Sequence, residues 1–311
     1  MEFGIIGLGK MGGSLALQAV EKGIRVVGLD RTPRQELAKN GVTVTTGLKE
    51  FIAELKPPRI IFLWIPAGPA VDELLKELGA VCAKGDIFVD GGNSHFRDSK
   101  VRHKQMKDKG FEFIDCGTSG GMSGARNGAC FMIGGESAPV KMVEPILIKL
   151  AVPEGYIHAG APGAGHFVKL IHNGIEFGML QAIGEGVALL NKSEFKVDLA
   201  ALFHNWAHGS VIRSWLIELM EAGLREKKDL AGIDSFVEDT GEVNWLVQEA
   251  LNLEVSIPVI SQSIMGLFQS REKVNDTFRA IALMRHGFGG HPFGPDKGIR
   301  EERKKGYVGL K

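Results

Sequence analysis

The chain has 311 residues, and lysine plus arginine balances aspartate plus glutamate at 37 each, so the formal net charge is zero. This balance removes the general attraction of a basic protein for nucleic acids or anionic membranes, although a local basic pocket for a small anion remains open. The chain starts without a charged leader, has no apolar run long enough to span a bilayer, and carries three cysteines (Cys82, Cys116, Cys130) without a paired spacing. We therefore expect a cytoplasmic protein with reduced thiols and enough length for two domains.

Short apolar runs alternate with helical patterns over the first half of the chain. The predicted strands are Glu2–Gly7, Ile24–Asp30, Arg59–Ile65, Asp86–Asp90, Phe111–Cys116 and Cys130–Gly134, and the helices between them include Met11–Gly23, Pro69–Leu78 and Ser94–Lys109. Continuous apolar strands alternating with helices are typical of a parallel sheet covered on both faces. The predicted fold class is therefore α/β, with a doubly wound parallel sheet.

A glycine-rich turn lies between the first predicted strand and the first predicted helix. It consists of Gly7, Leu8, Gly9, Lys10, Met11 and Gly12. The first glycine permits the tight turn, the second lets the backbone approach a pyrophosphate, and the third allows close contact between helix and strand. The strand before the motif, the helix after it and an acidic residue at the end of the next strand together indicate a Rossmann dinucleotide site.

Asp30 is that acidic residue, and it is placed to accept hydrogen bonds from the adenosine ribose of NAD. Arg31 beside it could pair with the extra phosphate of NADP, so NAD is favoured and NADP stays open. A capped turn at 30–33 without any cofactor contact is the alternative. The predicted cofactor site is completed by Ile65, which ends a later predicted strand, by Pro66 after it, and by Asn93 after the next strand.

Long helical patterns replace the strands after about Pro162. The predicted helices are Gly163–Asn191, Leu199–Ala207, Val211–Glu221, Glu242–Leu251 and Ile257–Met284. The breakpoint at 160–163 predicts a dinucleotide-binding domain at 1–162 and a helical domain at 163–311. The polar, charged stretch from about 292 is predicted to be a loosely ordered tail.

The first of these helices carries four polar side chains on one face. Lys169, His172, Asn173 and Glu176 are spaced at i, i+3, i+4 and i+7, while apolar residues surround them. Such a helix is normally buried, and a buried stripe with an amine, an imidazole, an amide and a carboxylate is costly unless the groups are paired or functional. The helix is therefore predicted to form one wall of an active site. Metal chelation by the His172–Glu176 pair is a weaker alternative, because no third ligand at suitable spacing is evident.

Two polar loops follow predicted strands and should face the same edge of the sheet. One is the segment from Asp90 to Ser94, which contains Asn93, and the other contains Ser119, Gly120 and Gly121. Ligands bind at the carboxyl ends of strands in such folds. Amides and hydroxyls there suit an anionic or polyhydroxy substrate.

These segments together resemble the 6-phosphogluconate dehydrogenase family. The resemblance rests on DGGNS at 90–94, GTSGG at 117–121 and GHFVKLIHNGIE at 165–176, and it extends from residue 1 to about 293, as in the short form of the family. It implies a Rossmann domain, a helical C-terminal domain, a homo-oligomer (dimer or tetramer), no metal, and oxidative decarboxylation of 6-phosphogluconate to ribulose 5-phosphate in the pentose phosphate pathway or gluconate utilisation.

The resemblance also implies a role for each site residue. Lys169 would be the base in hydride transfer and the cation in decarboxylation, and Glu176 the acid that protonates C1, with Asn173 as a third catalytic residue. Burial on an apolar helix would lower the pKa of the lysine and raise that of the glutamate, as both roles require. Substrate contacts would come from Asn93, Ser119, Gly120, Gly121, His172 and Asn173, with Arg271 as a phosphate ligand, and with Arg285 and His291 reaching a neighbouring subunit's site.

The chain departs from the long form of the family at the phosphate. Phe177 replaces a tyrosine after the catalytic glutamate, and the segment 239–245 lacks a lysine. Weaker binding of the substrate phosphate than in the long form is therefore one expectation. The alternatives are a β-hydroxyacid dehydrogenase that oxidises a small 3-hydroxy acid without losing carbon dioxide, and a non-catalytic dinucleotide sensor.

Overall fold

The structure is a computed structural model that describes residues 1–238, 241–272, 275–289 and 292–295. The chain divides into two compact units, one formed by 1–196 with 240–262 and the other by 197–239 with 263–311. The first unit carries the sheet and the second is helical in its described part. This arrangement confirms the predicted fold class, while the predicted boundary at 162/163 stays a prediction.

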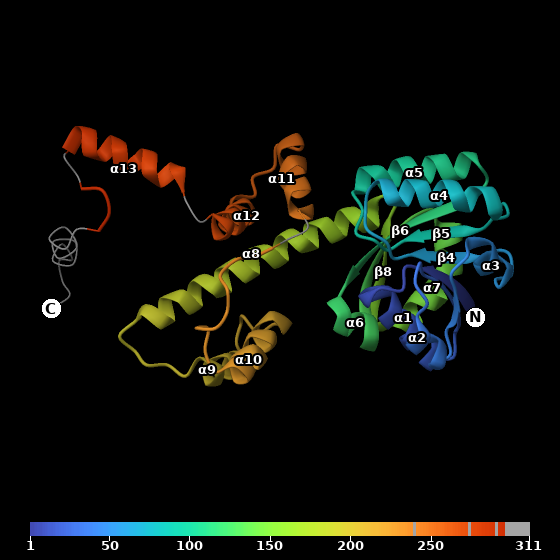
Figure 1. Ribbon diagram of the computed structural model, residues 1–311, viewed down its shortest axis with the longest axis horizontal. Coiled ribbons are helices and arrows are strands. Elements are labelled where there is room, and N and C mark those ends of the chain that lie inside the picture. The colour runs from blue at the N-terminus through green and yellow to red at the C-terminus, as the bar shows by residue number, and fades with distance from the viewer. Residues whose placement is uncertain (239–240, 273–274, 290–291, 296–311) are drawn as a thin grey trace. The chain divides into compact units, whose positions relative to one another are not determined.

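One eight-stranded sheet organises the first unit (Figure 1). Its strands are β1 (Glu2–Ile6), β2 (Arg25–Leu29), β3 (Thr43–Thr45), β4 (Ile60–Leu63), β5 (Ile87–Asp90), β6 (Glu112–Ser119), β7 (Ala129–Gly134) and β8 (Ala151–Gly160). The spatial order is β3-β2-β1-β4-β5-β6-β7-β8, and β1 to β6 are parallel to one another. The order reverses next to β1, which is where such folds bind dinucleotides.

Helices cover both faces of the sheet, so its central strands are apolar on both sides. On one face, Phe3, Ile5 and Val89 pack with α1 (Lys10–Glu21) and α7 (Ser137–Leu150). On the other face, Ile61 and Phe88 pack with α3 (Leu48–Ala53), α4 (Pro69–Val81) and α5 (Phe96–Asp108). Figure 1 shows α4 and α5 together on one side of the sheet and α1 and α7 on the other.

The sheet differs from the prediction at its edges. Strand β7 runs antiparallel to β6, because only nine residues separate Ser119 from Ala129, too few for the crossover that a parallel pair needs. Strand β3 has three residues and β8 contains Pro153 and Gly155, so neither shows the continuous apolar pattern of the predicted strands. Both lie at the edges of the sheet, where proline is tolerated.

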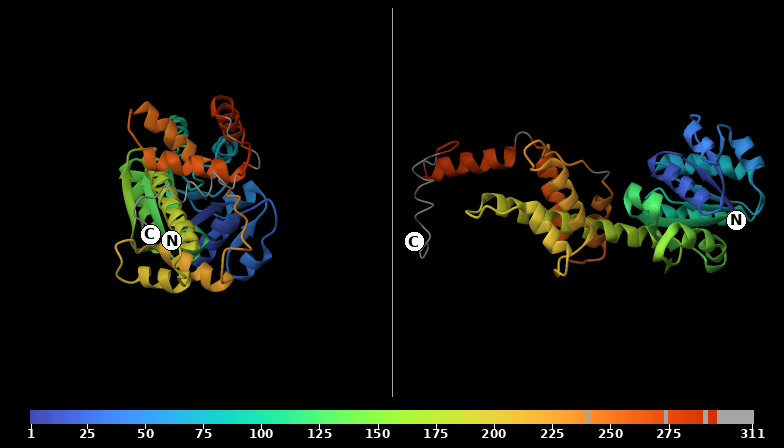
Figure 2. Two further views of the ribbon diagram at one scale, coloured as in Figure 1. Left: turned by 90° about the vertical axis from the view of Figure 1, so that its left-hand side faces the viewer. Right: turned by 90° about the horizontal axis from the view of Figure 1, so that it is seen from below.

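The remaining helices of the first unit are α2 (Gln35–Lys39), α6 (Gly121–Asn127), α8 (Ala164–Lys192) and α11 (Glu242–Asn252). The long helix α8 agrees closely with the predicted helix at 163–191, and Figure 2 shows it running out from the strands. Its burial is incomplete, because side chains such as Ile175 and Leu180 are exposed in the single chain, whereas Val187 near its end is buried. The prediction that the whole helix is buried is therefore wrong for the isolated chain.

The second unit contains α9 (Leu199–Ala207), α10 (Trp215–Lys227), most of α12 (Pro258–Arg271) and α13 (Asp276–Gly289). The single helix predicted at 257–284 is wrong, since α12 and α13 are separate. Asn275 accepts a hydrogen bond from the Phe278 amide at 3.3 Å, which is a helix-capping contact and starts a new helix there. The start predicted at Val211 is also wrong, because Ser214 caps α10.

Two further features concern the chain as a whole. Within the described ranges, no helix is both long enough and apolar enough to cross a membrane. Cys82, Cys116 and Cys130 are free thiols. Most of the predicted tail, including 296–311, lies outside the described residues.

Candidate active site

The glycine-rich turn has the backbone geometry that a pyrophosphate site requires. Gly7 has a φ of +94°, in the region that favours glycine, and a Cβ at Gly12 would lie 2.0 Å from the Gly7 carbonyl oxygen. A Cβ at Gly9 would instead meet open space. The N-terminus of α1 has neither a side-chain cap nor an acidic residue in its first turn, which leaves the first amides of the helix available to an anion. These residues fit the phosphates of a dinucleotide.

Asp30 closes the same turn from the end of β2. Its Oδ2 accepts a hydrogen bond from the Leu8 amide at 3.0 Å and its Oδ1 accepts from the Thr32 amide at 3.0 Å. Arg34 pairs with it at 3.1 Å. Burial raises the pKa of the carboxyl, but the hydrogen bonds from Thr32, Arg34 and Leu8 outweigh this and hold the pKa below its ordinary value. Asp30 is therefore an anion, as the predicted ribose contact requires, and it also builds the capped turn.

The loops after β4 and β5 are packed against each other by two glycines. A Cβ at Gly91 would lie 2.8 Å from the Trp64 indole ring, and one at Gly92 would lie 2.4 Å from the Ile65 carbonyl oxygen. The segment from Ile65 to Pro66 and the segment around Asn93 thus form one surface at the carboxyl edge of the sheet. The glycines of the 90–94 loop serve this close approach.

Helix α8 lies directly against the end of β6. A Cβ at Gly117 would lie 2.6 Å from the Cβ of Lys169, so only glycine permits this distance. The first turn of α8 is held by Asp115 of β6, whose oxygens accept from the Gly163 amide at 2.6 Å and the His166 amide at 2.8 Å. Lys169 is thereby fixed one turn beyond an anchored helix end.

Lys169, His172 and Ser119 form a chain of polar contacts. Lys169 Nζ lies 3.3 Å from His172 Nδ1, and His172 Nε2 lies 2.9 Å from Ser119 Oγ. A neutral imidazole with its proton on Nε2 would donate to Ser119 and accept from Lys169. Asn173 Oδ1 lies 3.3 Å from His172 Nδ1, and Glu176 Oε2 lies 3.8 Å from the same nitrogen. The four predicted residues of the helix therefore meet on one face, as the spacing predicts.

The electrostatics of this face favour a neutral amine. Lys169 is only 9 % exposed, and burial lowers its pKa below 10.5 although the charges of Glu176, Cys130 and Glu242 act in the other direction. Burial and the nearby lysine likewise lower the pKa of His172. Both groups can therefore lie closer to their neutral forms than surface lysine and histidine do.

Glu176 differs from the prediction. Its side chain is 41 % exposed, since it projects beyond the part of α8 that the sheet covers. The burial expected for this carboxyl group is therefore absent in the isolated chain. The carboxylate nevertheless lies on the same helix face as Lys169 and Asn173, at the open side of the cluster.

Glu242 is a site residue that the sequence patterns do not reveal. It lies in the first turn of α11, accepts a hydrogen bond from Asn93 Nδ2 at 2.5 Å, and is close enough to Lys169 to affect its pKa. Asn93 has a φ of 55°, a left-handed conformation that asparagine tolerates. Asn93 and Glu242 are 149 residues apart in the sequence, so no local pattern in the segment 239–245 indicates their contact.

The remaining predicted residues lie elsewhere in the chain. Gly120 and Gly121 follow β6 with φ values of 118° and 57°, and a Cβ at Gly121 would meet open space. Arg271 Nε donates to the Val237 carbonyl at 2.7 Å within the second unit, and the exposed Arg285 belongs to α13 of that unit. His291 lies outside the described residues. The roles of Arg271, Arg285 and His291 stay predictions.

No cluster of three or more histidine, cysteine, aspartate or glutamate side chains suited to a metal occurs in the described part of the chain.

Family models match both halves of the sequence. The NAD-binding domain of 6-phosphogluconate dehydrogenase matches residues 2–160, and the 6-phosphogluconate dehydrogenase C-terminal domain matches residues 165–287. The chain belongs to the 6-phosphogluconate dehydrogenase family. The cofactor of this family is a nicotinamide dinucleotide, and the fit of the glycine-rich turn described above agrees with this.

Relatives of this family match along nearly the whole chain. YqeC of Bacillus subtilis (strain 168), a provisionally named 6-phosphogluconate dehydrogenase, is 44% identical over 293 residues, which cover 94% of this chain and 98% of that protein. The NAD(+)-dependent, decarboxylating 6-phosphogluconate dehydrogenase of Haloferax volcanii is 38% identical over 295 residues, with 94% and 98% covered. Among solved structures, the Plasmodium falciparum 6-phosphogluconate dehydrogenase matches with a TM-score of 0.82 and 30% identity over 98% of this chain and 68% of that one.

Proposed function

We propose that this protein catalyses the oxidative decarboxylation of 6-phosphogluconate to ribulose 5-phosphate and carbon dioxide, with NAD as the preferred electron acceptor. The observation that carries the proposal is the buried Lys169, held on an anchored helix beside His172, Asn173 and Ser119. A relative that matches over 98% of its own length bears the name of this NAD(+)-dependent activity.

NAD when bound supplies the acceptor for the hydride that leaves C3 of the sugar acid. Lys169, with its lowered pKa, takes the proton of the C3 hydroxyl in the same step. The lysine is then protonated. Its charge stabilises the enolate that develops as the β-keto acid loses carbon dioxide, so that the chain itself supplies the required cation.

Glu176, in its protonated form, then gives a proton to C1 of the enediol, and Lys169 takes the proton of the enol hydroxyl so that the ketone forms. Its position two turns beyond Lys169 on α8 sets the two proton-transfer groups on the same helix face. The other polar groups of the face, among them Ser119, His172 and Asn93, orient the hydroxyls and the carboxylate of the substrate. Arg271 and Arg285 are the proposed phosphate ligands.

Replacement of Glu176 by glutamine tests the proton-transfer scheme. Glu176→Gln should leave NADH binding within about twofold of the parent protein and lower kcat by at least about a hundredfold, since general acid catalysis contributes this order of magnitude. Glu185→Gln is the matched control, because Glu185 lies further along α8 and its side chain accepts a hydrogen bond from Gln181 Nε2 at 2.8 Å. Normal turnover by Glu176→Gln would remove this residue from the mechanism.

The choice between NAD and NADP follows from Asp30. An anionic carboxylate at the end of β2 accepts hydrogen bonds from a ribose and repels a 2′-phosphate. We expect kcat/KM to be higher with NAD than with NADP, measured with saturating sugar acid. A clear preference for NADP would mean that Arg31 or Arg34 outweighs Asp30 at this position.

The main alternative is oxidation of a small 3-hydroxy acid without decarboxylation. Product analysis distinguishes it from the proposed reaction. Carbon dioxide release in equal amount to NADH formation supports the proposed reaction. NADH formation from a small 3-hydroxy acid, without carbon dioxide and without turnover of 6-phosphogluconate, would favour the alternative. A dinucleotide sensor would bind NADH and turn over none of these acids.

A further inference from the structure

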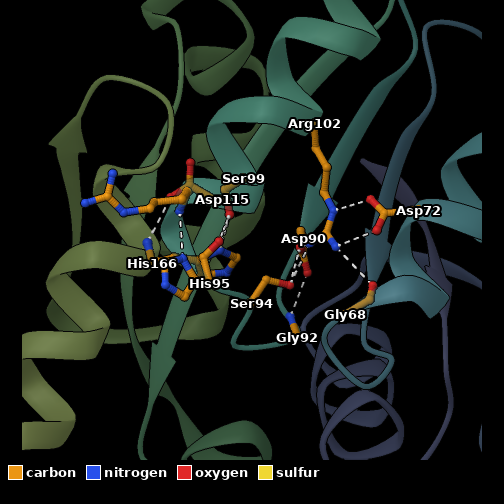
Figure 3. A network of polar contacts seen from close by, with 11 residues as sticks. Gly68, Asp72, Asp90, Gly92, Ser94, His95, Ser99, Arg102, Asp115 and His166 are labelled. Carbon is orange, nitrogen blue, oxygen red and sulfur yellow. Dashed lines mark hydrogen bonds and ion pairs between the residues drawn. The ribbon is translucent and has the colours of Figure 1, made fainter. Parts of the chain in front are cut away.

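A buried network connects α5 to the two loops that follow β4 and β5. Its centre is Arg102 of α5, which is only 1 % exposed and points toward the carboxyl edge of the sheet (Figure 3). Arg102 Nε donates to Asp72 Oδ1 at 2.7 Å and Nη2 donates to Asp72 Oδ2 at 3.2 Å, so the two side chains form a bidentate pair.

The same guanidinium reaches both loops. Its Nη2 donates to the Gly68 carbonyl at 3.0 Å, in the segment after β4, and its Nη1 donates to Ser94 Oγ at 3.1 Å, in the segment after β5. Asp90 completes the network, because its Oδ2 lies 3.5 Å from Nη1 and accepts from Ser94 Oγ at 2.7 Å. The other oxygen of Asp90 accepts from the Gly92 amide at 3.0 Å.

These contacts act on the backbone that carries the predicted cofactor residues. Gly68 lies two residues after Pro66, and Gly92 lies directly before Asn93. On their other side, the two loops touch through Gly91 with Trp64 and Gly92 with Ile65, where any Cβ would collide. The loops are thus held together both by glycine contacts and by Arg102.

We propose that Arg102 is a positioning residue for the dinucleotide: by bridging Gly68, Asp72, Asp90 and Ser94, it sets the relative placement of the 65–68 and 90–94 loops. Removing the bridge lets the loops separate, and the cofactor then has to restore their arrangement when it binds. The inference rests on the proposed function in one respect, namely that the dinucleotide binds against these two loops. It requires binding of NADH but no turnover.

The same strand offers a matched ion pair that should not affect the cofactor. Arg59 pairs with the buried Asp86 at 2.9 Å, and its amide donates to the same carboxylate at 2.7 Å. Asp86 directly precedes β5, whereas Asp90 ends it, so the two arginines hold opposite ends of one strand. Arg59→Lys therefore reproduces the loss of a buried guanidinium contact at the edge away from the predicted site.

The test compares NADH dissociation constants, measured by fluorescence titration, for Arg102→Lys, Asp72→Asn and Arg59→Lys, with Tm measured for each. Asp72→Asn is a second way to weaken the bridge. The Asp72 side chain is 55 % exposed, so this substitution does not remove a buried charged group. We expect Arg102→Lys and Asp72→Asn to weaken NADH binding by about tenfold, as the loss of a charge-assisted hydrogen bond predicts. Asp72→Glu, which keeps the carboxylate, should recover most of this loss.

Two results would overturn the inference. One is NADH affinity that is unchanged in both Arg102→Lys and Asp72→Asn, with Tm lowered as in Arg59→Lys, since Arg102 would then be a stabilising residue only. The other is an equal loss of NADH affinity in Arg59→Lys, which would show a general effect of loosening β5. If the parent protein binds NADH but does not oxidise 6-phosphogluconate, the proposed function fails while this comparison retains its meaning.

Discussion

At the scale of single residues, Lys169 is the group whose protonation controls the proposed reaction. Burial lowers its pKa, so the neutral form that accepts a proton becomes available below 10.5. We expect kcat/KM to rise with pH along an acid limb that reflects this lowered pKa. A pH–rate profile with no such limb between neutral pH and the ordinary lysine range would contradict the assignment of Lys169 as the base.

The same lowered pKa affects stability. Between the folded pKa and 10.5 the unfolded chain binds a proton at this lysine that the folded chain does not, so the free energy of unfolding should increase with pH across this window. Lys169→Met should remove that part of the pH dependence and stabilise the protein near neutral pH, by about 1.4 kcal/mol for each unit by which the pKa is lowered. Chemical denaturation at several pH values measures this effect, with Lys192→Met at the exposed end of α8 as control. If the free energy of unfolding depended on pH equally in Lys169→Met and Lys192→Met, the lowered pKa of Lys169 would be refuted.

Two glycines of the first turn should respond differently to the same substitution. Gly9→Ala places a methyl group in open space, so Tm should change little while NADH binding weakens by at least about tenfold through collision with the pyrophosphate. Gly12→Ala places it 2.0 Å from the Gly7 carbonyl oxygen and should lower Tm as well. Thermal unfolding and NADH titration of both variants separate these effects. Full NADH affinity in Gly9→Ala would place the dinucleotide elsewhere.

At the scale of elements, the anchoring of α8 determines where its functional face lies. The first turn has no side-chain cap from within the helix, and Asp115 of the neighbouring strand supplies the acceptors for its amides instead. Burial raises the pKa of this carboxyl, whereas its contacts with His166 and the helix amides lower it. The strand and the helix therefore share one polar anchor, and Lys169 follows directly after it.

Asp115→Asn should displace the start of α8 and lower kcat together with stability. We expect a loss of about 1–3 kcal/mol in the free energy of unfolding, the usual effect of an unsatisfied buried hydrogen-bonding group. Asp198→Ala, which removes the cap of α9, should cost about 1 kcal/mol and leave kcat unchanged. Denaturation curves and initial rates of both variants make the comparison. Unchanged kcat in a folded Asp115→Asn protein would show that this anchor does not position the functional face of α8.

The elements also show which parts of the fold are predictable from the sequence. The glycine-rich turn and the face of α8 depend on spacings of a few residues, so local patterns indicate both. Arg102 and Asp72 are 30 residues apart in the sequence, and Asp115 and Gly163 are 48 apart. Contacts of this kind depend on how the sheet brings distant segments together. Strands β3 and β8 were missed for a different reason, since one is very short and the other is interrupted by Pro153 and Gly155.

At the scale of the whole molecule, the exposed apolar side chains suggest an assembled state. Leu189 of α8 and Val211 before α10 are among the large hydrophobic residues exposed in the single chain. Exposed apolar groups of this kind often mark protein interfaces. We propose a homo-oligomer in which Arg285 of one chain serves the site of another.

Mixing two inactive variants tests this sharing. Lys169→Met and Arg285→Ala should each have little activity alone, and subunits exchanged between them should restore about a quarter of the parent activity, since half of the random dimers contain one intact site of two. Activity should be measured after mild dissociation and reassociation, with size-exclusion chromatography to confirm exchange. Mixed assemblies that stay inactive would mean that each chain supplies its own Arg285.

The central claim concerns the reaction itself, and one assay tests it most directly. The purified protein is mixed with 6-phosphogluconate and excess NAD, and NADH is followed by absorbance while released carbon dioxide is quantified. We predict rapid formation of both products in equal amounts, which would also show that the chain compensates for Phe177 and the lysine missing from 239–245. A folded protein that binds NADH yet forms neither product, with NAD or with NADP, would contradict the assignment.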